Sequence, residues 1–215
     1  AVVIVSTVVF LMQMNSRAKE SEASAQFQSA VKQYQQDLAA STISFDAQSE
    51  DGTTQVPDMK VQTKSIGSFQ AIYDNYPGTD AGRHALYMVA VSELNQGQYE
   101  EAIASFDNFV SKYSDSLLAA SSLLGKATAE YNMGRTEQSL ESLKQIETRY
   151  PNYPLKDVLT YEMAKRYQAM DRIPDARQKY EEVVEKYPDS SWKTLSEKAL
   201  EELDNSKDKS DNNSA

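Results

Sequence analysis

Apolar positions recur along this chain with a period of 37 residues from about residue 60 onward. A fixed period in the range of 20 to 50 residues is typical of a repeat array, in which each unit buries its apolar face by stacking on its neighbours. The pattern therefore predicts an all-α solenoid of antiparallel helix pairs. The positions that keep this spacing are Phe69, Phe106, Leu143 and Tyr180; Ile72, Phe109, Ile146 and Val183; Ala102, Ser139 and Ala176; and Tyr76, Tyr113, Tyr150 and Tyr187.

The first helix of each unit is predicted over residues 81–96, 118–133 and 156–170. These helices carry a small residue at matched positions, Ala90, Ala127 and Ala164, where two helices must approach closely. Gly97 and Gly134 follow the first two helices, as expected of a residue that ends a helix with a positive φ. Asp171 takes this position in the third unit.

The segment before the regular repeats predicts an irregular opening unit. Phe27, Val31, Tyr34 and Leu38 fall on one face of a helix over residues 16–40. Residues 41–58 contain Gly, Pro and many Ser and Thr, which predicts a loop, and the repeat register begins at about residue 61.

Residues 1–14 are almost wholly apolar and uncharged, and Arg17 and Lys19 follow them. We expect the outer part of a transmembrane helix over residues 1–15, although 14 helical residues reach only about 21 Å of the ~30 Å hydrocarbon core. A signal-peptide apolar region and a buried soluble helix are the alternatives.

Four regions follow from these patterns. We expect a membrane helix over residues 1–15, a helix with a polar loop over 16–60, and repeats over 61–203 that end in a capping helix at 195–203. The tail 204–215 is rich in Asn, Asp, Ser and Lys, which predicts disorder.

Composition excludes several functions. The net charge of −10 and the pI near 4.7 argue against nucleic-acid binding, which needs clustered Lys and Arg. These 215 residues contain no cysteine, so we expect no disulfide, no thiolate metal site and no lipid-modified cysteine anchor within them. His84 is the only histidine and no glycine-rich phosphate loop is present. We therefore expect neither an enzyme nor a cofactor.

The sequence Gly-Gln-Tyr-Glu-Glu-Ala at 97–102, followed by Phe106 and a closing Tyr-Pro or Tyr-Ser, resembles the tetratricopeptide repeat (TPR). The closing elements at 76–79 and 187–190 resemble those of bacterial envelope proteins, among them the Tol-Pal-associated periplasmic TPR protein and the outer-membrane-assembly lipoproteins. With its apolar first segment, the chain is also similar to the membrane-anchored ancillary subunit of the Sec translocon. This last resemblance implies a single-pass protein of the bacterial inner membrane whose repeats face the periplasm.

The TPR resemblance implies a groove for a peptide, lined by the first helix of each unit. Asn95 and Asn132 are the sharpest candidates, since a side-chain amide can both donate to and accept from a bound backbone. Lys165 is the one cation among these positions, which does not favour a clamp for a terminal carboxylate. The groove positions by register are His84, Tyr87, Val91, Leu94 and Asn95; Ser121, Leu124, Thr128, Tyr131 and Asn132; and Tyr161, Lys165 and Gln168.

Three functions remain open from the sequence. The chain could be a membrane-anchored adaptor that holds client proteins in the envelope, at the translocation machinery for example. It could instead be a permanent structural subunit of a larger membrane complex, or a cytosol-facing receptor. All three have protein partners and a membrane attachment, and none has a nucleic-acid partner.

Overall fold

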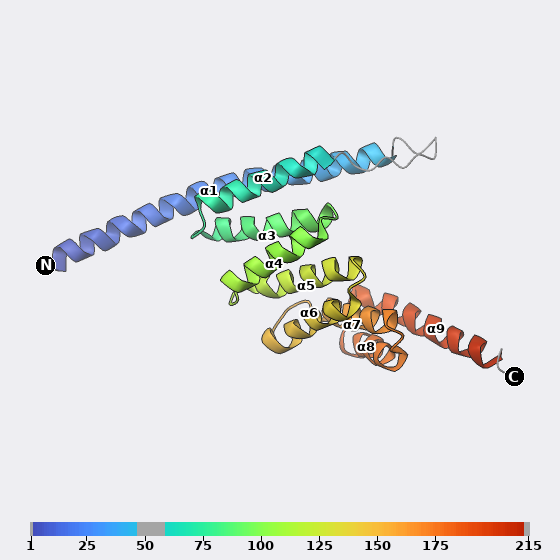
Figure 1. Cartoon of the computed structure of the whole chain (residues 1–215). Helices are drawn as coiled ribbons and strands as arrows, with labels where there is room; N and C mark the ends of the chain where they lie inside the picture. Colours follow the sequence, from blue (N-terminus) through green and yellow to red (C-terminus); the bar gives the residue numbers. More distant parts are fainter. Residues whose placement is uncertain (1, 47–58, 213–215) are drawn as a thin grey trace. The chain divides into compact units, whose positions relative to one another are not determined.

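The computed structural model describes the backbone of residues 2–46 and 59–212, and side chains within 13–39 and 65–205. Every regular element in these ranges is a helix, which confirms the predicted all-α fold there. The helices (Figure 1) are α1 Val2–Asp46, α2 Met59–Asn75, α3 Asp80–Asn95, α4 Tyr99–Lys112, α5 Leu117–Asn132, α6 Thr136–Arg149, α7 Lys156–Ala169, α8 Ile173–Lys186 and α9 Ser191–Asn212.

The 37-residue period appears directly in the helix boundaries. Helices α4, α6 and α8 begin at residues 99, 136 and 173. The residues that precede them by two positions have positive φ, with values of 74° at Gly97, 75° at Gly134 and 56° at Asp171. The predicted helix-ending turns are therefore confirmed, including the one in which aspartate replaces glycine.

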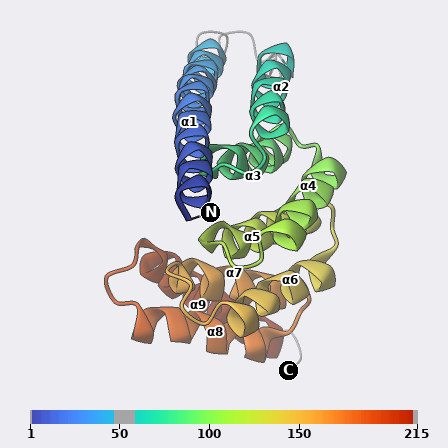
Figure 2. The same ribbon diagram turned by 90° about the vertical axis from the view of Figure 1, so that its left-hand side faces the viewer.

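Two compact units make up the chain, residues 1–105 and residues 106–215. In the first unit, α1 lies beside α2 and α3, as Figures 1 and 2 both show. Tyr34, Phe69, Ile72 and Val89 are buried in its core, and Phe27, Val31 and Leu38 of α1 pack against this core. The predicted apolar face of the opening helix is thus confirmed.

Helix α1 is longer than predicted. It continues through residues 41–46, where a loop was expected, and the rest of that predicted loop, 47–58, lies outside the described residues. Across the described ranges, no helix combines the length and the apolar composition that crossing a membrane requires. The predicted transmembrane helix over 1–15 is therefore not supported, because the uncharged run ends near Met14 and α1 continues as a polar sequence.

The second unit contains the end of α4 and the helices α5 to α9. Helices α5 and α6 form one antiparallel pair and α7 and α8 form the next. Ser139 lies fully buried at the close approach of α6 to α5, where its hydroxyl donates a hydrogen bond of 2.6 Å to the Ala127 carbonyl. The small residues predicted for this approach are buried throughout: Ala90, Ala102, Ala127, Ser139, Ala164 and Ala176.

Helix α9 packs against α8 and α7 and buries Ala199 and Leu203. It begins four residues before the predicted capping helix and includes residues 204–212 of the predicted tail, since no Gly or Pro follows Pro188. In register with buried Leu123 and Ala127, α9 carries the exposed Glu197 and Glu201. Its outer side is therefore polar, as expected where a repeat array ends.

Candidate protein-binding face

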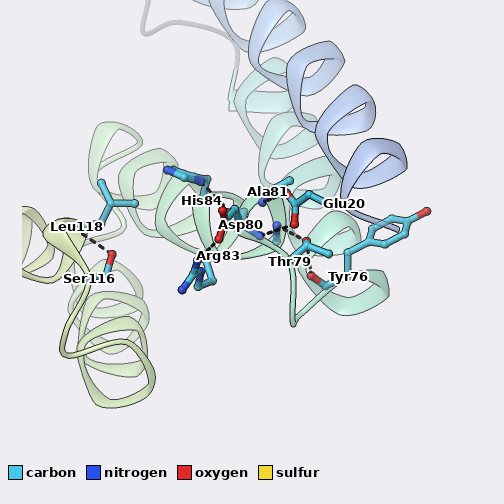
Figure 3. Close-up of polar contacts among 10 residues, drawn as sticks. Glu20, Tyr76, Thr79, Asp80, Ala81, Arg83, His84, Ser116 and Leu118 are labelled. Carbon is cyan, nitrogen blue, oxygen red and sulfur yellow. Dashed lines mark hydrogen bonds and ion pairs between the residues drawn. The ribbon is translucent and has the colours of Figure 1, made fainter. Parts of the chain in front are cut away.

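The start of α3 is fixed by two side-chain caps (Figure 3). Thr79 accepts a hydrogen bond of 2.9 Å from the Gly82 amide, which is the ordinary N-cap interaction. The carboxylate of Glu20, which belongs to α1, accepts from the amides of Asp80 at 2.9 Å and Ala81 at 3.3 Å. Because a helix N-terminus favours negative charge, Glu20 holds α1 against the beginning of α3.

The predicted groove residues of α3 lie on the side that α1 contacts. The His84 ring lies 5.9 Å from the ring of Phe27, and its Nδ1 donates to the Asp80 carbonyl over 2.8 Å. The Asn95 amide donates a hydrogen bond of 2.7 Å to the Tyr34 hydroxyl. Both residues nevertheless remain exposed in part, so α1 borders this face at its two ends.

Between His84 and Asn95, Tyr87, Val91 and Leu94 are half-buried. The five positions therefore share a helix face, as the register predicts. The role of this face as a peptide-binding groove stays a prediction.

Helix α5 presents the matching positions of the second unit. Asn132 is exposed, whereas Ser121, Leu124 and Thr128 are half-buried. Leu124 packs on the core, the Thr128 hydroxyl donates to the Leu124 carbonyl over 3.0 Å, and the Ser121 hydroxyl lies 3.4 Å from that of Tyr153. Asn132 is therefore the most accessible polar group of this set.

Helix α7 contributes an aromatic and cationic cluster. The Tyr161 ring lies 4.7 Å from the ring of Trp192 in α9 and 5.8 Å from that of Tyr180. The Lys165 ammonium lies 5.7 Å from the centre of the Tyr161 ring and its side chain is 38% exposed. Gln168 accepts a hydrogen bond of 2.8 Å from the buried Tyr180 hydroxyl, so its amide oxygen supports the fold.

Trp192 and Leu195 extend this face onto α9. Leu195 stands in register with His84 and Ser121 and is 45% exposed, while Trp192 is half-buried against Tyr161. The sequence prediction missed both because it treated α9 as a cap alone. Treating α9 as the first helix of one more repeat, 37 residues after α7, would have identified Leu195 as a position of this face.

Arg166 is a second residue that the sequence prediction missed. It is only 1% exposed, and its Nε donates a hydrogen bond of 2.9 Å to the Ser139 hydroxyl. Its guanidinium also pairs with Glu162 and lies 4.0 Å from the centre of the Tyr131 ring. One sequence signal could have identified Arg166. The equivalent positions of the two earlier repeats hold small residues, Ser92 and Ala129, where this repeat has a charged one.

Two glutamates shielded from solvent stand at equivalent positions of successive repeats, half-buried Glu93 and buried Glu130. Burial raises the pKa of Glu130, and the Ser142 hydroxyl and the Lys126 ammonium oppose this increase. Burial likewise raises the pKa of Glu93, opposed by the Ser105 hydroxyl. Within the described residues, no cluster of His, Asp and Glu side chains is arranged to hold a metal ion.

The model of one protein family, YfiO, described as an outer membrane lipoprotein, matches residues 79–209, which is more than half of the chain. The chain belongs to this family. A search of curated proteins found no match. The finer resemblance to the Sec and Tol-Pal proteins stays a prediction.

Two solved structures with a similar fold are described as TPR proteins. A tetratricopeptide repeat protein from Parabacteroides merdae is 18% identical, with a TM-score of 0.56 over 70% of this chain and 57% of that one. The chain thus spans little more than half the length of that protein. The TPR-like repeats of a kinesin-light-chain-type protein from Podosopora anserina are 16% identical, with a TM-score of 0.59 over 86% of each chain.

The structure of MamA is 13% identical, with a TM-score of 0.50 over 72% of this chain and 93% of MamA. Identities this low show the fold alone. Together with the helix pairs, they establish a TPR-like array, a fold that serves as a scaffold for contacts between proteins.

Proposed function

We propose that this chain is an adaptor of the bacterial envelope that binds a protein partner. The binding face is formed by α5 and α7, the first helices of the two repeats that lie within residues 106–215. The observation that carries the proposal is the half-exposed cluster of Tyr161, Lys165 and Trp192, which continues into exposed Leu195. Tyrosine and tryptophan dominate the energetics of protein interfaces, because they bury a large apolar area and keep a polar group.

The accessible polar groups beside this cluster suit a polypeptide ligand. Asn132 is exposed at the end of α5, and Thr128 lies one turn before it on the same face. A side-chain amide can satisfy both the N–H and the C=O of a bound main chain. We propose no catalytic activity and no cofactor for the chain.

An envelope location is proposed on two grounds. The family is described as one of outer membrane lipoproteins. The uncharged run at residues 1–14 also suits a lipid environment. Whether the repeats work at the translocation machinery or at another envelope assembly is part of what the experiment decides.

Site-specific photocrosslinking in native membranes tests the proposal. A photoreactive residue replaces Asn132, and the same residue at exposed Glu181 on α8 serves as the control. We expect partner capture at Asn132 and none at Glu181. The substitution Thr128→Arg places a bulky charge on the face and should abolish that capture. The control Glu185→Arg, at an exposed position of α8, should leave the capture unchanged.

The alternatives give different results. One stoichiometric partner captured at both positions would identify a permanent subunit and end the adaptor proposal. Protease protection in intact cells separates a periplasmic location from the cytosol-facing receptor. Capture at Asn132 that persists in Thr128→Arg would show that the face assignment is wrong.

A further inference from the structure

Figure 1 shows the beginning of α1 extending past the ends of α2 and α3. Residues 13–19 are consecutive helical residues of α1, nearly two full turns, and each of them is exposed. Among the α1 side chains that the structure describes, residues 13–39, the first buried one is Ala23, four positions later. The exposed turns are therefore a projecting segment of a helix whose later part is docked.

The docked part fixes the direction of this segment. Glu20 binds the amides that begin α3, the Gln26 amide donates to the Tyr76 hydroxyl over 3.0 Å, and Tyr34 lies against Phe69 with ring centres 6.0 Å apart. Since α1 is a single helix from Val2 to Asp46, no hinge separates these contacts from the projecting turns.

Charge distribution shows which surface this segment suits. The chain carries a net charge of −10, yet residues 1–19 contain Arg17 and Lys19 and no acidic residue. Both cations are exposed, and they directly follow the uncharged run 1–14. An apolar helical segment bordered by cations is the arrangement that binds anionic lipid surfaces.

We infer that α1 is a rigid arm that docks on an anionic lipid surface through residues 2–19 and holds the rest of the first unit at a fixed distance from it. The seven exposed residues 13–19 span about 10 Å at about 1.5 Å per residue. This inference rests on the envelope location proposed above, but it names the lipid class and the geometry of attachment. The first unit would then keep a set orientation to the lipid surface instead of swinging on a flexible tether.

Vesicle co-sedimentation of the full chain tests the lipid surface. We expect binding to phosphatidylglycerol-containing vesicles that exceeds binding to phosphatidylcholine vesicles, and a loss of about fivefold in affinity for each cation removed in Arg17→Ala and Lys19→Ala. The matched control removes two exposed lysines elsewhere, Lys32→Ala with Lys156→Ala, and should leave the anionic preference unchanged. Equal losses in both pairs, or no preference at all, would overturn the lipid assignment.

Spin labels test the rigidity. The chain has no cysteine, so Asn15→Cys and Asn75→Cys give one labelled pair within the first unit. We expect a narrow distance distribution that broadens in Ala18→Pro, because proline disrupts the helix. A broad distribution without the proline would overturn the rigid arm. Vesicle binding that fails while capture at Asn132 persists would reject this inference alone, and the reverse result would reject the proposed function alone.

Discussion

The Ser142 hydroxyl donates a hydrogen bond of 2.7 Å to the Glu130 carboxylate, and both residues are buried between α6 and α5. The same pairing of a first-helix glutamate with a second-helix serine occurs one repeat earlier, between Glu93 and Ser105. Two successive repeats thus share a partly or fully buried acid as well as their apolar positions, and the raised pKa of this acid makes stability depend on pH.

Glu130→Gln should weaken the pH dependence of stability. Because burial raises the pKa of Glu130 in the folded state above its ordinary value of 4.5, its proton binds more tightly to the folded chain. The resulting stabilisation is fully present below pH 4.5 and is lost as pH rises through the raised pKa. In urea denaturation between acidic and neutral pH, the free energy of unfolding of Glu130→Gln should increase relative to that of the unchanged protein as the pH rises.

Glu137→Gln, at an exposed position of α6, is the control for this change. It removes the same charge without removing a buried carboxylate, and it should follow the unchanged protein across the pH range. If Glu130→Gln follows it too, the buried carboxylate is not responsible for the pH dependence.

Arg166→Ala should lower the free energy of unfolding by about 3–5 kcal/mol, because it leaves Glu162 without its buried cation and opens a cavity beside Tyr131. Arg166→Met keeps an apolar stem and should lose less. Lys165→Ala, one residue earlier and 38% exposed, should change the unfolding free energy by less than about 1 kcal/mol. Equal losses in Arg166→Ala and Lys165→Ala would contradict the network.

Gly125→Ala should destabilise the second unit by about 1–3 kcal/mol, since a Cβ at this position would lie 2.4 Å from the buried Phe106 ring. Phe106→Leu in the same chain should recover part of that loss. Gly67→Ala provides the opposite case, because nothing lies within 4 Å of its added Cβ and α2 gains helix propensity of about 1 kcal/mol. Thermal unfolding should therefore show a lower Tm than that of the unchanged protein for Gly125→Ala and a smaller decrease for Gly125→Ala with Phe106→Leu. The Tm of Gly67→Ala should be higher than that of the unchanged protein.

Gly134→Ala should cost about 1–2 kcal/mol, because its φ of 75° lies in the left-handed region. Asp171→Gly removes such strain from the equivalent turn, whose φ is 56°, and should leave the unfolding free energy unchanged or higher. The comparison is made by chemical denaturation, and a large loss in Asp171→Gly would mean that the aspartate side chain stabilises this turn.

The sequence predicted the repeat period, the helix pairs and the turns because all three depend on local, periodic signals. Phe69, Phe106, Leu143 and Tyr180 occupy the same place in successive units, and each is at most 1% exposed. Such positions can be identified without knowing any long-range contact.

What the sequence could not predict depends on side chains that meet across helices. Arg166 breaks the apolar pattern and is buried only because Ser139, Glu162 and Tyr131 surround it. Nothing in the sequence around Glu20 distinguishes it from other surface acids, and only the packing of α1 places its carboxylate at the start of α3. The extent of α1 and α9 was also underestimated, since polar helical residues without Gly or Pro resemble loop or tail in composition.

The equal spacing of Gly97, Gly134 and Asp171 has an evolutionary consequence. The backbone amide of the next residue donates a hydrogen bond to the carbonyl five residues before it. The donors are Gln98, at 3.0 Å, and Arg135 and Arg172, both at 2.9 Å. Because these junctions are interchangeable, duplication or deletion of one whole 37-residue segment would rejoin the chain with the same geometry. Descendants of this gene could therefore change the length of the array in single steps, and the polar α9 would still close it.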